Sequence, residues 1–216
     1  MPFNPQQFLA VFAAYNAAVW PAQVIAYALG LAIVFVLWRP VPMGQRAIGV
    51  SLTSMWVWTG IGYHALFFSK INQPALVFGA LFVLQGLLLF HASVVRDELR
   101  FGRPGTLSRW VGWALLLYAL VLYPLAGIWA GHHYPELPMF GITPCPVTLF
   151  TFGLLLLTTR AVPRRLLVIP FLWSLVGGSA AMLLGMPQDW PLLFAGIVTT
   201  AILLARDRAK PAAVPA

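Results

Sequence analysis

The chain has 216 residues, of which 61% are apolar and only 8% are charged, and its mean hydropathy is +0.86. Soluble domains are roughly 45–50% apolar and about 25% charged, so a soluble fold of this length would leave much apolar surface in water. The net charge of +8 does not predict a nucleic-acid partner, because the basic residues are scattered between apolar stretches instead of forming one face or run. Composition therefore excludes an ordinary soluble domain and predicts an integral membrane protein.

Cysteine usage and the N-terminal sequence set two further limits. Cys145 is the single cysteine, which excludes an internal disulfide and a metal cluster built from cysteines. The first basic residue is Arg39, so the N-terminus lacks the basic region of a cleaved signal peptide. We therefore expect the first span itself to direct insertion.

A helix needs about 20 mainly apolar residues to cross the hydrocarbon core of a bilayer. In chain order we expect a short helix over residues 5–16 along the outer interface, followed by seven spans. The predicted spans are 20–38, 47–68, 74–95, 110–130, 146–159, 166–184 and 190–205. The fifth is short, and it begins either with irregular backbone or earlier, near Phe140. The predicted fold class is all-α: one polytopic transmembrane helix bundle over residues 1–208, with a disordered cytoplasmic tail over 209–216.

The charges of the connections predict the orientation of the bundle. Twelve of the lysine and arginine residues fall in alternate connections and in the C-terminal region, and Lys70 alone falls in the other set. By the positive-inside rule the arginine-rich connections are cytoplasmic, so the N-terminus is outside and the C-terminus inside. Tryptophans stand at the predicted span ends, where indole rings favour the headgroup level: Trp20, Trp38, Trp110 and Trp190. The predicted location is the inner (plasma) membrane.

An internal repeat relates the first three spans to the last three. Trp58 and Gly62 in the second span match Trp173 and Gly177 in the sixth at the same spacing, and Gln73 and Gln188 follow at the same offset. The resulting parallel 3+1+3 plan is shared by the SWEET sugar transporters, in which substrate binds between the repeats. Those transporters place Pro-Gln near span ends, whereas here Asn72-Gln73 replaces it in the first unit, so the likeness is one of plan. Chance matching in apolar sequence remains the alternative.

The connection over residues 131–146 gathers four side chains that suit a soft metal ion or redox chemistry: His132, His133, Met139 and Cys145. Their spacing matches no known ligand signature, and a structural lid is the alternative interpretation. Cys145 follows Thr143, which we expect to cap a helix, and Pro144, which suits the first turn. The thiol is then either activated by the helix dipole or packed as a small apolar group.

Polar side chains within or beside the spans are candidates for a substrate path or gate: His64, Tyr63, Gln85 and Asn16. An ionisable group such as His64 within a span is a functional hypothesis, with a hydrogen bond to a neighbouring helix as the alternative. No carboxylate falls inside a predicted span, which excludes a proton relay through buried Asp or Glu. No catalytic motif is present, and we predict no catalytic residues and no resident cofactor.

Three strings carry a resemblance: Phe3-Asn4-Pro5-Gln6-Gln7-Phe8, Tyr63-His64-x-x-Phe67-Phe68-x-x-Ile71-Asn72 and Gly141-Ile142-Thr143-Pro144-Cys145-Pro146. Together they resemble a domain-of-unknown-function family of bacterial multi-pass membrane proteins, over nearly the whole chain. The resemblance implies an inner-membrane protein of about seven spans and implies no activity.

The leading hypothesis is a small-solute permease or carrier, with assembly as a homodimer left open and with the lipid bilayer and a small molecule as partners. The alternative is an outward-facing metal-binding or redox protein or sensor. A membrane enzyme with unassigned residues and an accessory subunit of a membrane complex also remain open.

Overall fold

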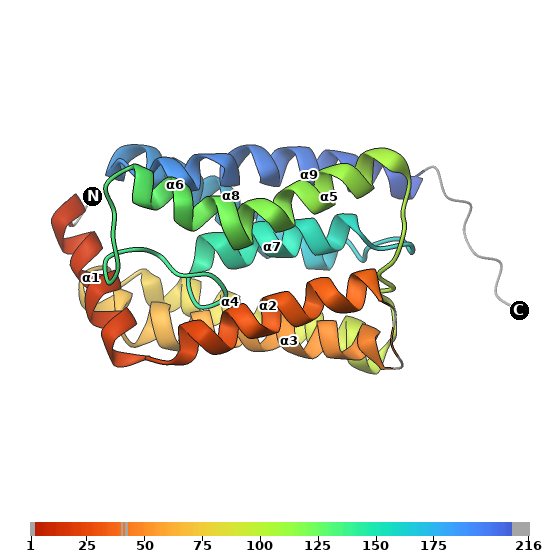
Figure 1. The fold of residues 1–216 in the computed structure, drawn as a ribbon, viewed down its shortest axis with the longest axis horizontal. Coiled ribbons are helices and arrows are strands. Elements are labelled where there is room, and N and C mark those ends of the chain that lie inside the picture. The colour runs from red at the N-terminus through yellow and green to blue at the C-terminus, as the bar shows by residue number, and fades with distance from the viewer. Residues whose placement is uncertain (1–2, 40, 42, 209–216) are drawn as a thin grey trace, which may run out of the picture.

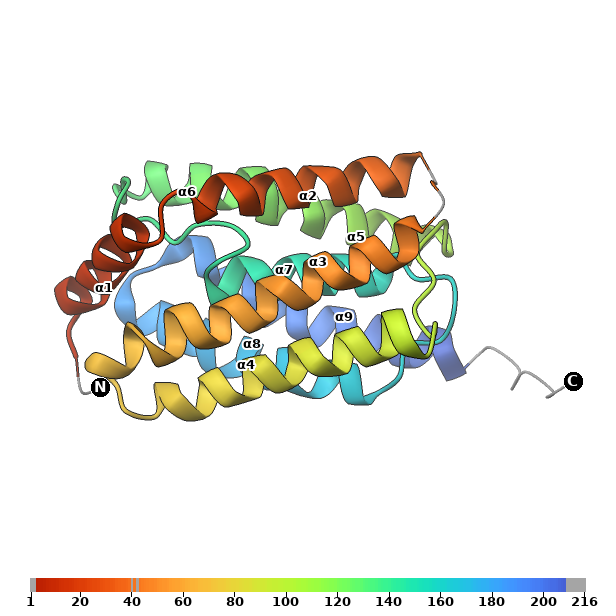
Figure 2. The ribbon, with the colours of Figure 1, turned by 90° about the horizontal axis from the view of Figure 1, so that it is seen from below.

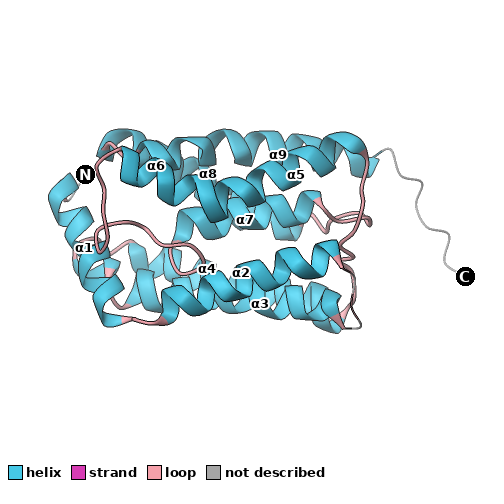
Figure 3. Ribbon diagram, viewed as in Figure 1, coloured by secondary structure: helices cyan, strands magenta, loops and turns pink. Residues whose placement is uncertain are grey.

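The computed structural model describes residues 3–39, 41 and 43–208, and its regular structure is helical throughout that part of the chain, apart from one isolated bridge between Phe101 and Thr158 (Figure 3). The α-helices are α1 (Pro5–Ala18), α2 (Ala22–Trp38), α3 (Gly44–Trp58), α4 (Ala75–Phe90), α5 (Thr106–Leu117), α6 (Tyr123–Trp129), α7 (Pro144–Leu156), α8 (Arg165–Leu184) and α9 (Trp190–Arg208). Wider π-helical turns, Thr59–Ala65, His91–Val95 and Tyr118–Leu122, continue α3, α4 and α5. The predicted disordered tail over 209–216 lies outside the described residues.

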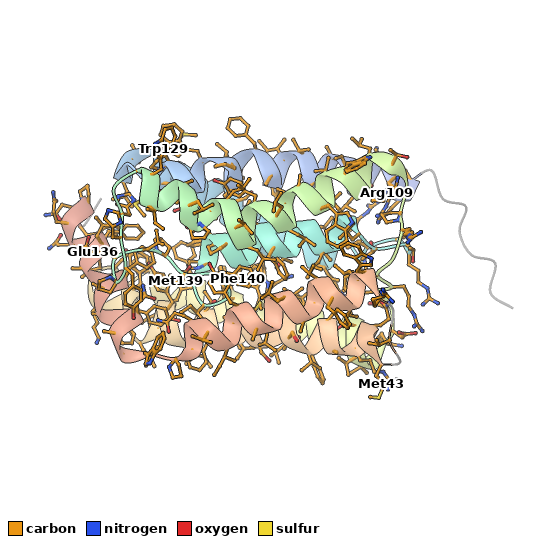
Figure 4. All side chains as sticks on the ribbon, in the orientation of Figure 1. Met43, Arg109, Trp129, Glu136, Met139 and Phe140 are labelled. Atoms are coloured by element: carbon orange, nitrogen blue, oxygen red, sulfur yellow. The ribbon has the colours of Figure 1, made fainter. Side chains whose placement is uncertain are left out.

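The long helices lie side by side along one axis, with chain direction alternating from one to the next (Figures 1 and 2). Helix α1 instead crosses one end of the bundle, at 85° to α2. Its first turn is fixed by a capping box. The Gln7 backbone N–H donates to Asn4 Oδ1 at 2.8 Å, and the Asn4 backbone N–H donates to Gln7 Oε1 at 2.9 Å. We call this end of the bundle the α1 end. The arginine-rich connections lie at the opposite end, the basic end, where Arg109 and Met43 are labelled in Figure 4.

Four helical segments are long and apolar enough to cross a membrane: Ala75–Val95, Thr106–Trp129, Arg165–Leu184 and Pro187–Arg208. The bent pair α1 and α2 makes up to five. Of the seven predicted spans, two therefore fall short of this length and hydropathy if the bent pair is one span, and three if it is not. The segment formed by α3 and its π-helical turn carries several hydroxyl side chains and His64, which lower its hydropathy, and α7 has only 13 residues.

The surface around the sides of the bundle is apolar. Large aliphatic and aromatic side chains are exposed along the helices, among them Leu31, Phe35, Val77, Leu183 and Phe194. Such a continuous surface is rare on soluble monomers and is typical of contact with lipid. All four tryptophans predicted to mark span ends are exposed, and Trp129 at the α1 end is 93% exposed (Figure 4). The surface thus has the character of a membrane-associated protein.

Helix α7 is the centre of the bundle, and twelve of its thirteen residues are buried. This helix corresponds to the fifth predicted span, 146–159, which was expected to begin either with irregular backbone or earlier, near Phe140. In the structure the helix begins at Pro144, two residues before the predicted start, and the chain from Leu137 to Thr143 enters the bundle without regular structure. Figure 4 shows Met139 and Phe140 of this re-entrant segment between the two halves of the molecule. A helix enclosed by protein can be shorter than the bilayer is thick.

Side chains of α1 hold the re-entrant segment in place. Asn16 Nδ2 donates to the carbonyl oxygens of Pro135 and Leu137 at 2.7 and 2.8 Å, and Tyr15 Oη donates to that of Ile142 at 2.8 Å. Irregular backbone at membrane depth requires such partners, because lipid supplies none. The expected cap of α7 is wrong in one respect: the Thr143 hydroxyl donates back to Met139 O at 2.7 Å, and no side chain caps the helix.

Pairs of glycines let helix backbones touch at two crossings. A Cβ on Gly112 of α5 would lie 3.0 Å from the Gly153 carbonyl oxygen of α7, and one on Gly153 would lie 2.9 Å from that of Gly112. Gly60 and Gly79 form the same reciprocal contact between the π-helical turn after α3 and helix α4. Small residues at such crossings are the usual means by which membrane helices pack closely.

At the basic end, Arg206 of α9 closes the other end of α7. Its guanidinium donates to the Thr158 carbonyl oxygen at 2.9 Å and to the Leu156 carbonyl oxygen at 3.4 Å, and its Nε donates to Asp207 at 2.7 Å. Carbonyl groups at a helix C-terminus have no partner within the helix, and a cationic side chain satisfies them well. The central helix is therefore anchored by side-chain donors beyond each end.

We expect Arg206→Gln to lower stability by about 1–3 kcal/mol, because it leaves these partly buried carbonyl groups without their donor. The measurement is thermal unfolding of the purified protein in detergent, with an expected fall in Tm of a few degrees. The control is Arg208→Gln, which removes an exposed guanidinium from the same helix turn. Equal Tm values for the two variants would contradict the anchoring role.

Candidate functional site

A cavity of about 200 Å³ lies inside the α1 end of the bundle, where irregular segments and short helical turns meet. Tyr63 reaches it from the π-helical turn, Cys145 from the first turn of α7, Trp173 from α8 and Asp189 from the 3-10 turn Pro187–Asp189. Other lining side chains are aromatic or apolar, including Phe8 of α1 and Phe78 of α4. The site therefore combines polar groups from distant parts of the chain within an apolar wall.

The π-helical turn explains how two successive side chains enter the interior together. Tyr63 and His64 are both at most 1% exposed, although they are neighbours in the sequence. A wider turn changes which side chains share a face, and π-helical turns occur often at functional sites. The glycine contact between Gly60 and Gly79 brings α4 directly against this turn.

Asp189 is the single carboxylate that lines the cavity, and it is only 4% exposed. Tyr123 Oη of α6 donates to its Oδ1 at 2.5 Å, and the Cys145 thiol lies beside it. The ion pairs found among the described residues, Arg100–Asp97, Arg165–Glu98 and Arg206–Asp207, all belong to the basic end. Asp189 thus receives hydrogen-bond donors from the protein but no cationic side chain.

This finding corrects one expectation from the sequence. The sequence puts every carboxylate outside the predicted spans and so excludes a buried one, whereas the 3-10 turn between α8 and α9 carries Asp189 inside the bundle. A signal was present: Asp189 directly precedes the apolar run that begins at Trp190, so it stands at the positive end of a helix dipole. What the sequence does not display is that α6 and α7 cover this helix start.

His64 lies in a box of aromatic rings. Its imidazole centroid is 4.7 Å from that of Phe82 and 5.1 Å from that of Trp173. Both ring nitrogens are buried and have no hydrogen-bond partner among the described residues, and the same holds for Trp173 Nε1. The Cys145 sulfur lies beside this indole nitrogen but outside hydrogen-bond geometry. Buried polar atoms without partners are rare in proteins and mark places where another molecule binds or water enters.

A second cavity of about 190 Å³ adjoins the first, farther along the boundary between α4 and α8 toward the basic end. Phe78, Trp173 and Val176 line both cavities. The Phe78 and Trp173 rings meet edge to face with centroids 5.4 Å apart. These two rings therefore form a partition between the cavities, and His64 packs against both.

The four predicted path residues have separate positions. Tyr63 lines the cavity, and His64 lies behind the partition, where its ring packs against Phe78 and Trp173. Gln85 lies farther along α4, fully buried, where its Nε2 donates to Leu166 O of α8 at 3.0 Å and its Oε1 has no partner among the described residues. Asn16 is a structural residue in this structure, because it binds the re-entrant segment and not the cavity.

The four predicted metal or redox residues are spread over the α1 end. Cys145 faces Asp189, His132 lies with Nδ1 3.4 Å from Gln188 Nε2, His133 is exposed, and Met139 packs against the apolar side chains of α1. Within the described part of the chain, no three His, Cys, Asp or Glu side chains are grouped so that they could hold a metal ion. The metal or redox hypothesis stays an untested prediction.

Comparison with known proteins places the chain in a family. No curated protein and no solved structure matches it significantly. A family model does match, over residues 5–213, and its description is a family of unknown function, DUF6064. The match covers nearly the whole chain and confirms the resemblance that the three sequence strings carried. The chain belongs to the DUF6064 family.

Proposed function

We propose that this protein is a small-solute permease or carrier of the inner (plasma) membrane, with its solute site in the cavity between Tyr63, Cys145, Trp173 and Asp189. In this proposal the bundle crosses the bilayer seven times, with the α1 end outside and the basic end in the cytoplasm. The observation that carries the proposal is that buried ring nitrogens of His64 and Trp173, which have no partner among the described residues, lie beside a cavity.

The proposed seven spans include α3 and α7 in addition to the longer apolar helices. Helix α7 need not match the bilayer thickness, because protein surrounds it on all sides. The chain direction alternates along the bundle, and the arginine-rich connections gather at one end (Figures 1 and 4). Moving these arginines through a bilayer would cost about 2.5–3.5 kcal/mol each on insertion scales, which supports a cytoplasmic basic end.

The proposed path runs between α4 and α8. The two cavities follow one another along this boundary, and the Phe78–Trp173 partition between them is suited to act as a gate. Gln85, with its unpartnered Oε1 near Leu166 of α8, continues the line of polar atoms toward the basic end. In the predicted repeat, α4 closes the first unit and α8 belongs to the second, so the path lies at the repeat interface, as in transporters built from repeats.

The conformation of the two matched tryptophans supports the repeat. A Cβ on Gly62 would lie 3.4 Å from Trp58 Nε1, and one on Gly177 would lie 3.1 Å from Trp173 Nε1, so each indole folds over the glycine four residues later. The two indoles differ in their partners. Trp58 Nε1 donates to Tyr15 Oη at 2.8 Å, whereas Trp173 Nε1 is unpartnered beside the cavity. The indole N–H of the first unit is thus occupied by Tyr15, whereas that of the second unit has no acceptor among the described residues.

We expect Phe78→Trp to reduce solute flux at least about tenfold, because extra ring volume in a packed partition blocks the passage between the cavities. The measurement is uptake by proteoliposomes over a broad panel of small solutes. Val77→Trp, on the lipid-facing side of the same helix, is the control and should keep flux unchanged. Absence of flux for every solute tested, or equal flux in the two variants, would contradict the carrier.

We expect reporters fused after Arg103 and after His133 to report opposite compartments, since the proposed topology puts the first in the cytoplasm and the second outside. A pair of reporters with opposite requirements, such as alkaline phosphatase and green fluorescent protein, makes the measurement. A fusion after Arg208 serves as the cytoplasmic control. The topology is wrong if the Arg103 and His133 fusions agree.

A further inference from the structure

We infer that the solute of this cavity is a small organic cation, a primary or quaternary ammonium compound. The inference rests on the proposed function for the identity of the site, and it adds the chemical class of the solute. Two independent features of the cavity lead to it: a buried carboxylate that has no cationic partner among the described residues, and a wall of aromatic rings.

The first feature is the buried carboxylate of Asp189. Asp189 is 4% exposed and lines the cavity, and its neighbours are the Tyr123 hydroxyl and the Cys145 thiol. Taking a carboxylate out of water is expensive, and buried carboxylates are usually paired with a cation. Among the described residues, Lys70 is the only lysine or arginine at the α1 end of the bundle, and it is exposed with its Nζ 4.7 Å from the Phe67 ring centroid. A cationic solute would supply the missing partner.

The histidines at the α1 end do not take that role. His132 lies against the Gln188 amide, and His133 is exposed. His64 is enclosed by Phe82 and Trp173, with its nitrogens unpartnered among the described residues. Among the described residues, Asp189 therefore has no cationic partner at the α1 end, and a cation that enters the cavity would supply one.

The second feature is the wall of aromatic side chains around the cavity. Four elements contribute rings to this wall: the π-helical turn with Tyr63, the 3-10 turn Phe68–Lys70 with Phe68, α4 with Phe78 and α8 with Trp173. Phe3 and Phe8 close it from the α1 side. A cation within about 6 Å of a ring centroid is attracted by the ring quadrupole, most strongly over tryptophan, and aromatic cages of this kind bind quaternary ammonium groups. A neutral or anionic solute would gain nothing from this attraction, and an anion would be repelled by Asp189. Both features thus favour the same charge.

The test is calorimetric titration of the full-length protein, purified in a maltoside detergent so that no choline headgroup is present. The probes are choline, tetramethylammonium and 3,3-dimethyl-1-butanol, which is the neutral carbon analogue of choline. We expect saturable binding of both cations and binding of the neutral analogue that is at least about tenfold weaker. This comparison uses the wild-type chain, so it does not depend on any variant folding.

Variants then assign the binding to Asp189. We expect Asp189→Asn, which keeps the shape of the side chain, to weaken cation binding at least about tenfold. The matched control is Glu136→Gln, which removes an exposed carboxylate from the same end of the bundle and should leave binding unchanged (Figure 4). Equal binding of choline and its neutral analogue, no binding of either cation, or equal affinity in the two variants would overturn the inference.

Failure of this inference is separable from failure of the carrier. Cation binding that depends on Asp189, without flux in proteoliposomes, supports the cation class and contradicts the carrier. Flux of neutral solutes that Phe78→Trp blocks, without cation binding, supports the carrier and overturns the cation class.

Discussion

The structure depends on one constraint: polar backbone groups inside an apolar bundle need partners from the protein itself. The constraint is most demanding at the re-entrant segment Leu137–Thr143, which enters the bundle without regular structure. Asn16 and Tyr15 of α1 meet it by donating to three carbonyl groups in and beside the segment. At the other end of α7, Arg206 does the same for the carbonyl groups of Leu156 and Thr158. The crossing helix α1 and the last turn of α9 thus hold the central helix in place.

The late start of α7 also creates the cavity. Because the chain becomes helical only at Pro144, deep in the bundle, its first turn faces other helices and not water. Prolines at positions 144 and 146 suit this location, since they remove two backbone N–H groups that would lack partners. Cys145 between them therefore meets Asp189 and Trp173, side chains that a regular helical crossing would have kept apart.

The cavity is polar only where irregular elements meet. Asp189 comes from a 3-10 turn, Tyr63 and His64 from a π-helical turn, and Cys145 from the first turn after the re-entrant segment. Regular helix–helix contacts elsewhere combine apolar side chains and glycine pairs such as Gly112 and Gly153 with single hydrogen bonds such as that of Gln85. Polar side chains thus gather where the helix geometry is irregular. This is expected of a functional site, because irregular backbone costs stability and is retained where function requires it.

Composition and hydropathy alone predicted the helical class and the apolar surface with exposed tryptophans at helix ends, because these follow from local sequence and from the surrounding medium. The three strings around Phe3, Tyr63 and Gly141 identified the family for the same reason: they are contiguous in the chain. The sequence did not reveal the partners of the polar residues. Asn16 was predicted to line a path but binds the re-entrant segment, and Asp189 was placed in a connection but lines the cavity. Burial of a side chain depends on which helices cover it, and that is decided only when segments more than a hundred residues apart pack together.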